Sequence, residues 1–133
     1  MTLFETLVTL TIVALLGALA FPAMDRSAQS LAVAEARVRL MADLRIARGR
    51  AMAQDRIVAV RPLAGGSGYV ADGARRALPE GVTLRAGREG GIAFHPDGSA
   101  AGGALRFARD TAAVSITVDP TTGSLAIRDG NGR

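Results

Sequence analysis

The sequence predicts an α+β protein in which one long N-terminal helix packs, through its second half, on a C-terminal domain of antiparallel strands. Three observations support this class. The first two dozen of the 133 residues are apolar apart from a few hydroxyl groups and one acid, Glu5. Apolar side chains then recur at helical spacing as far as about Gln54, in a stripe of Leu31, Ala34, Val38, Met41 and Leu44, with Leu40, Ala47 and Ala51 alongside. From Ile57 onward, short β-rich runs alternate with Gly, Pro and Asp turns.

The helix should consist of a membrane-spanning first half, residues 1–24, and an amphipathic second half, residues 25–55, followed by the β domain at 56–133. As a helix, the first segment would extend about 36 Å, which is enough to cross a bilayer. Ala18-Leu19-Ala20 also resembles a signal-peptide cleavage site, but no Arg or Lys precedes the apolar core. We therefore expect a single-pass anchor.

The composition of the chain argues against several kinds of site. Without cysteine, disulfides and thiolate catalysis are excluded. The single histidine, His95, has no nucleophile or carboxylate pair placed with it in the sequence. Asp97 and Asp119 offer oxygen ligands, but their spacing matches no calcium loop and both fit ordinary turns. We expect no enzymatic activity, no cofactor and no metal site.

Glu5 is the ionisable group that the apolar segment must accommodate. A carboxylate in lipid costs about 2.5 kcal/mol or more unless it is neutralised, shallow or paired. The nearest arginine, Arg26, is about 30 Å away along a helix. The remaining partner is an α-amino group at residue 1, in this chain or a neighbour. Alternatively, the carboxylate reaches the membrane interface near the chain end.

Two residues should weaken the helix within the apolar segment. Pro22 lacks an amide proton and clashes with the carbonyl near Ala18. Gly17 lowers the helix propensity of the same turn. We expect a kink there, which an ordinary membrane helix would also show.

The N-terminal pattern resembles the mature N-terminus of type IV pilins and type II secretion pseudopilins. It consists of Met1-Thr-Leu-Phe-Glu5, an apolar run and Pro22. The resemblance implies that prepilin peptidase removes a leader before Met1 and N-methylates that residue. It also implies that Glu5 neutralises the terminal amine of another subunit and sets the register of assembly. The family usually has Phe where this chain has Met1.

Seven runs are expected as antiparallel strands, and two turn sequences, 96–98 and 119–123, should close hairpins. The strands are expected at 57–60, 69–71, 82–85, 91–94, 104–107, 114–118 and 124–127.

Residues 92–99, Gly102-Gly103 and 116–123 resemble the C-terminal domain of the GspH/FimT family, the H-type minor pseudopilins and related minor pilins. This resemblance implies a pilin-like fold and a structural subunit of a type II secretion filament. The implied location is the bacterial inner membrane, with the C-terminal domain in the periplasm. The implied partners are other pilin subunits, prepilin peptidase, and the assembly platform and ATPase of the system.

Two other functions remain open. One is a minor or major pilin of a type IV pilus, serving adhesion, motility or DNA uptake. The other is a lone membrane anchor whose periplasmic domain binds a ligand, for which Glu5 would be dispensable.

The densest basic stretch runs from Arg45 to Arg61 and includes Arg48, Arg50 and Arg56. If folding gathers these side chains, they would contact nucleic-acid phosphates without sequence preference. A solvated or subunit-contacting face is the alternative. DNA-binding relatives of the FimT type carry arginine-bearing tails, which Asp129 interrupts here.

Overall fold

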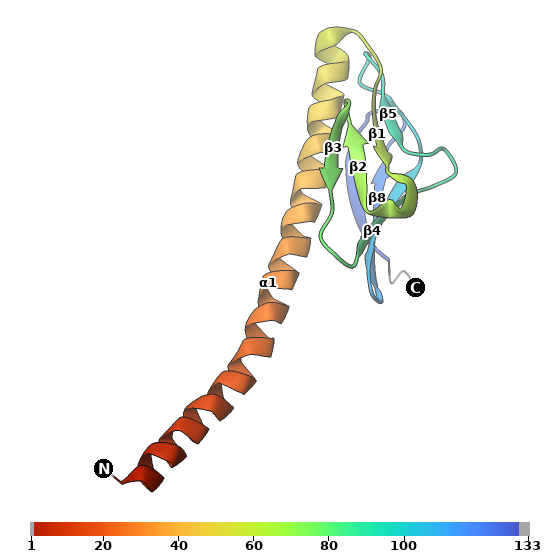
Figure 1. The fold of residues 1–133 in the computed structure, drawn as a ribbon. Helices are drawn as coiled ribbons and strands as arrows, with labels where there is room; N and C mark the ends of the chain where they lie inside the picture. The colour runs from red at the N-terminus through yellow and green to blue at the C-terminus, as the bar shows by residue number, and fades with distance from the viewer. Residues whose placement is uncertain (1, 131–133) are drawn as a thin grey trace. The chain divides into compact units, whose positions relative to one another are not determined.

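The computed structural model describes residues 2–130. For residues 21–27, which lie within the helix, it describes the backbone but not the side chains. Helix α1 covers Leu3–Gln54 (Figure 1). The chain divides into two compact units, Met1–Ala34 and Glu35–Arg133, which are described separately. The remaining elements are β1 (Val58–Pro62), the 3-10 turn η1 (Ala64–Gly66), β2 (Gly68–Ala71), β3 (Ala74–Ala77), β4 (Val82–Ala86), β5 (Ile92–Phe94), β6 (Ala100–Ala101), β7 (Ala104–Arg109), β8 (Ala112–Val118) and β9 (Leu125–Asp129).

All seven predicted strands are present, and two short ones were missed. Strand β3 has the sequence Ala-Arg-Arg-Ala, without the β-branched or aromatic residues that mark a strand. It pairs with β2 because Asp72 and Gly73, both at positive φ, close a two-residue hairpin turn. Strand β6 has only two residues, and its pairing with β5 defines it. Both are edge strands, where little burial constrains the sequence.

The strands form two antiparallel sheets, a division that the strand pattern does not predict. One sheet has the order β3-β2-β1-β5-β6 and the other β4-β7-β8-β9. Both predicted turns close hairpins. His95 donates its amide to the Ser99 carbonyl at 2.9 Å, joining β5 to β6. Asp119 donates to the Ser124 carbonyl at 2.8 Å, joining β8 to β9.

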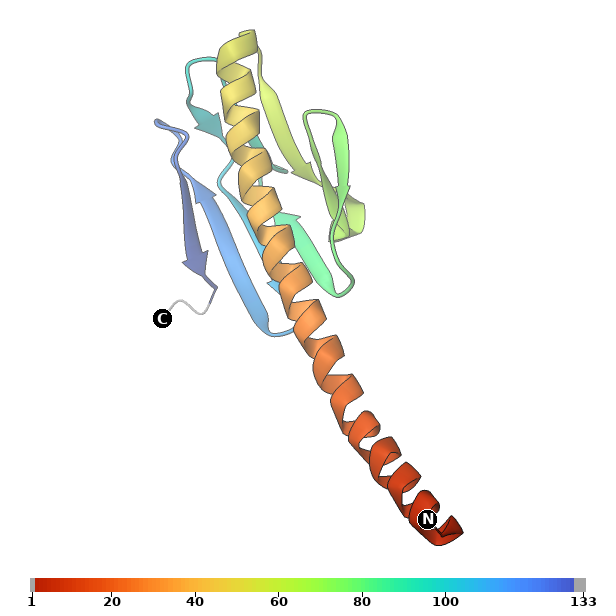
Figure 2. The same ribbon diagram turned by 90° about the vertical axis from the view of Figure 1, so that its left-hand side faces the viewer.

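The second half of α1 packs against the sheets (Figure 2). Its buried stripe differs from the sequence expectation, which included Leu31 and Val38. These two side chains are 70% and 66% exposed. A helix rotates by about 100° per residue, so a step of three residues falls about 60° short of a full turn. A stripe continued through several three-residue steps therefore moves away from the face that contacts the sheets. The buried residues are Leu40, Met41, Leu44, Ala47 and Ala51.

Both sheets contribute alternate residues to one core beneath this stripe. Tyr69 and Phe94 are the largest fully buried side chains. Since successive strand residues point to opposite faces, the intervening residues form an outer face on each sheet. This arrangement confirms the predicted α+β, pilin-like class. The other strand residues in the core are Val58, Val60, Ala71, Val82, Leu84, Ile92, Ala100, Leu105, Phe107, Ile116 and Val118.

Gly102, the first glycine of the Gly-Gly sequence after β6, tolerates no side chain. Its φ is +102°, and a Cβ placed there would collide with the carbonyl of Gly91. The backbone at Gly91 and the backbone at Gly102, which flank the β5–β6 hairpin, can therefore lie in contact only because residue 102 is glycine.

Candidate functional site

The N-terminal segment of α1 has the length and composition of a membrane span. The apolar stretch Leu3–Ala20 would measure about 27 Å as a helix. Its threonine hydroxyls are satisfied within the helix, because Thr6, Thr9 and Thr11 donate to carbonyls four residues earlier at 3.0, 2.8 and 2.7 Å. Internal bonds of this kind let hydroxyl groups enter an apolar environment at little cost.

Thr2 caps the start of α1, a role that the sequence analysis missed. Its hydroxyl accepts a hydrogen bond from the Glu5 amide at 3.3 Å. The sequence Thr-x-x-Glu is the capping-box signature, and it could have identified this helix start. The Glu5 side chain is exposed, in the first turn, where the positive end of the helix dipole favours a carboxylate. Glu5 therefore has a local function at the helix start, and its intermolecular role stays a prediction.

The other predicted N-terminal sites are only partly described. Met1, expected to be N-methylated and to pair with Glu5, lies outside the described residues. Gly17 and Pro22 both lie within α1, whose helical assignment is continuous from Leu3 to Gln54. The expected kink at these two residues stays a prediction.

The four arginines proposed for nucleic-acid contact have different surroundings. Arg50 and Arg56 both donate to Asp72 in the β2–β3 turn, each at 2.7 Å. Arg48 donates to the carbonyl of Gly98 at 3.2 Å, while Arg45 is exposed. Hydrogen bonds from Arg56 and Arg50 lower the pKa of Asp72, and the bond from Arg56 has the larger effect. Nucleic-acid contact at these arginines stays a prediction.

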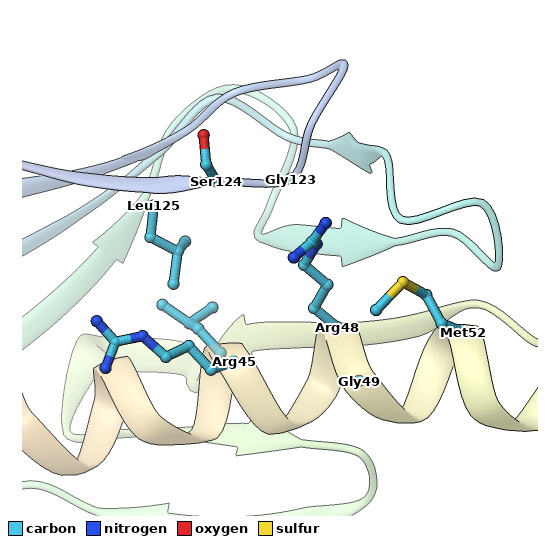
Figure 3. Close-up of a pocket in the computed structure, with 8 residues that line it drawn as sticks. Arg45, Arg48, Gly49, Met52, Gly123, Ser124 and Leu125 are labelled. Carbon is cyan, nitrogen blue, oxygen red and sulfur yellow. The ribbon is translucent and has the colours of Figure 1, made fainter.

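A pocket of about 300 Å³ lies between α1 and the β8–β9 turn (Figure 3). Arg45 and Arg48 border it on the helix side, and Leu125 projects into it from β9. The two predicted turns meet beside it, because Ala100 donates its amide to the Pro120 carbonyl at 3.0 Å. Arg48 thus connects the helix to the junction of both hairpins. The remaining lining residues are Leu44, Gly49, Met52, Gly123 and Ser124.

The acids of the two turns are used as hydrogen-bond acceptors within the turns. Asp97 Oδ1 accepts from the hydroxyl and amide of Ser99 at 2.6 and 2.9 Å. Asp119 Oδ1 accepts from the amides of Thr122 and Thr121 at 2.8 and 2.9 Å. These bonds lower the pKa of both carboxyl groups. Across the described residues, no three His, Cys, Asp or Glu side chains gather in a way that would hold a metal ion.

A polar contact fastens the β2–β3 hairpin to α1. The Tyr69 hydroxyl donates to Asp43 Oδ2 at 2.7 Å, and Arg76 lies 3.5 Å from the same oxygen. The Tyr69 side chain is 1% exposed. Burial, followed by the hydrogen bond to Asp43, raises the pKa of Tyr69 well above its ordinary value.

This contact predicts an unusual alkaline titration. The chain has one tyrosine and no Trp, Cys or Lys, so phenolate absorbance reports Tyr69 alone. We expect Tyr69 to stay protonated at about pH 11 in the folded protein and to ionise there in urea. The folded form then holds a proton that the unfolded form releases, so stability is complete below about pH 10 and falls as pH rises further. Tyr69→Phe should remove this pH dependence. Equal phenolate absorbance with and without urea would contradict the prediction.

Comparison with known families gives a match that includes the turn at 96–98 and ends within the turn at 119–123. Residues 36–122 match the family described as type II transport protein GspH. Searches among curated proteins and among solved structures returned no match. The matched residues run from the buried half of α1 to the β8–β9 turn and make up more than half of the chain. The chain therefore belongs to the GspH family of type II transport proteins.

Proposed function

We propose that this chain is a pseudopilin, a structural subunit of a filament assembled at the inner membrane by a type II secretion system. In this proposal residues 1–24 span the membrane before assembly, residues 25–55 complete the helix, and residues 56–133 form the periplasmic domain. One observation carries the proposal. The GspH match at 36–122 occurs in the same chain as an apolar helix whose first turn holds a single acid, Glu5.

The family supports the coarser statement directly. GspH proteins are pseudopilins of type II secretion, a structural class that associates with other pilin subunits rather than an enzyme class. For this chain, those subunits would be copies of itself or other pseudopilins.

Glu5 would set the register between subunits. Its carboxylate would neutralise the terminal amine of Met1 in a neighbouring subunit. Two opposite charges about 4 Å apart attract by roughly 4 kcal/mol at an effective dielectric of 20, before desolvation is subtracted. A misplaced subunit would leave the carboxylate unpaired in an apolar environment. The pair therefore contributes more to correct placement than to overall affinity.

The other parts of the mechanism come from outside the chain. Prepilin peptidase would remove a leader and N-methylate Met1, and the assembly platform and its ATPase would drive extraction from the membrane. The glycine stretch at 65–68 does not have the pattern of a phosphate-binding loop, because no Lys-Ser or Lys-Thr follows it. In the structure it lies at the β1–β2 connection rather than at a helix start. The loosened turn proposed at Gly17 and Pro22 would let the helix adapt on packing.

The decisive test is the mass of the N-terminal peptide of the protein purified from its native membrane. We expect a chain that begins at Met1 and carries one added methyl group. A chain that begins at Phe21 would indicate a cleaved secretory signal, and an unmethylated initiator Met would indicate a plain anchor. Either of these results would overturn the proposal.

A further inference from the structure

The outer face of the four-stranded sheet carries a row of arginines that crosses three of its strands. On β4 and β7, buried residues alternate with the exposed ones that form this face. In the strand register, Arg85 lies opposite Arg106, Arg106 opposite Ser115, and Ser115 opposite Arg128. We call Arg85, Arg106 and Arg128 the arginine row.

The arginine row is not neutralised by the part of the chain that the structure describes. None of its three guanidinium groups forms an ion pair or hydrogen bond with a described residue. Arg50 and Arg56, by contrast, are both held by Asp72. Like charges placed directly opposite on neighbouring strands destabilise a sheet. Arg85 and Arg106 have this arrangement, which a bound anion would relieve.

The side chains around the arginine row are small. A pocket of about 230 Å³ lies at the paired arginines, lined by Thr83, Arg85, Arg106 and Ala108. Among the described residues of the four strands, the outer face has no acidic and no aromatic side chain. A partner backbone can therefore approach closely. The other outer-face residues are Ala104, Ala113, Ser115, Thr117 and Ala126.

We propose that this face docks an α-helix of a partner protein whose carboxylates form a row. Neighbouring strands are about 4.8 Å apart, which places Arg106 about 5 Å and Arg128 about 14 Å from Arg85 along the row. Positions i, i+3 and i+10 of a helix rise by about 4.5 and 15 Å and stay on one face. Three carboxylates at those positions match the three guanidinium groups, which favour carboxylate through paired hydrogen bonds.

A nucleic acid fits the same face less well. Three phosphate contacts are few, because proteins that bind nucleic acid through charge make about six to ten. The face also lacks aromatic side chains on which bases would stack. The inference does not rest on the filament role, because it concerns the sheet of β4, β7, β8 and β9 and is tested without assembly.

The test uses the full chain in neutral-detergent micelles and a labelled alanine-rich helical peptide with Glu at i, i+3 and i+10. We expect saturable binding by fluorescence anisotropy. Arg106→Glu should weaken binding about tenfold or more, because like charges then face each other. A peptide with Lys at i+3 should restore binding to that variant, which excludes misfolding as the cause. Arg75→Glu is the matched control, since Arg75 is an exposed arginine on β3 of the other sheet.

Four outcomes would overturn the proposal. The peptide does not bind. A peptide with the same three Glu residues on different faces binds equally well. Arg75→Glu weakens binding as much as Arg106→Glu does, which would show attraction to net charge alone. A single-stranded oligonucleotide of equal charge binds more tightly than the peptide and loses that affinity in Arg106→Glu, which would assign the face to nucleic acid.

Discussion

Replacing Glu5 by Ala should reduce incorporation of this chain into filaments by at least about tenfold, while the chain still accumulates in the membrane. Removing one partner of a buried ion pair would leave the Met1 amine of the neighbouring subunit unpaired, at a cost of about 3–5 kcal/mol, which exceeds the roughly 1.4 kcal/mol that corresponds to tenfold. Incorporation is measured as the fraction of the protein recovered in sheared or cross-linked filaments, relative to the membrane pool.

Glu5→Gln separates the two functions of this residue. Gln serves as well as Glu in a capping box, so helix capping with Thr2 survives this change while the charge is lost. We expect Gln to fail as Ala does. Glu35→Ala is the control, because Glu35 is an exposed acid of the same helix whose ion pair is with Arg39 of its own chain, at 3.2 Å. Normal incorporation of Glu5→Gln would show that the negative charge is not needed, and normal incorporation of Glu5→Ala would favour a lone anchor.

Leu44→Ala should lower the free energy of unfolding of the C-terminal unit by about 2–5 kcal/mol. Leu44 is fully buried in the stripe of α1 that covers the core, so truncation removes apolar contact and leaves a cavity. For a unit of this size the melting temperature should fall by roughly 10 °C or more. Near-ultraviolet circular dichroism of Tyr69 reports the loss of packing in the full chain.

Ile46→Ala is the matched control for the core prediction. Ile46 lies two residues further along the same helix and is 51% exposed, so its replacement should change the stability by no more than about 0.5 kcal/mol. If Leu44→Ala and Ile46→Ala shift the melting temperature equally, then the helix stripe described here is not what stabilises the domain.

The secondary structure was largely predictable because local chemistry marks it. The helix was expected to end at about Gln54 and does so at Gln54, and the turns at 96–98 and 119–123 close the hairpins expected of them. Family membership was also predicted, from residues 92–99, 102–103 and 116–123, and the match at 36–122 confirms it. In these segments Pro, Gly and Asp fix the backbone by themselves, so the residues read in sequence suffice.

The parts that were missed depend on contacts between distant residues. Strand β3 has no propensity signal and exists through its pairing with β2. The exposure of Leu31 and Val38 depends on which side of the helix meets the sheets. The structure also shows that two arginines of the dense basic stretch are neutralised. Asp72, at least sixteen residues away along the chain, pairs with Arg50 and Arg56.

The sequence alone determined the class of protein, the apolar helix with Glu5 in its first turn, the positions of seven strands, and the turns at 96–98 and 119–123. These follow from hydrophobicity, spacing and turn chemistry, which act over a few residues. Within residues 2–130, only the tertiary structure decided how nine strands divide between two sheets, which arginines are neutralised, and that Arg85, Arg106 and Arg128 share one unpaired row. The reason is that strand register places Arg106 opposite Arg85, twenty-one positions earlier in the chain, and no local pattern records that pairing.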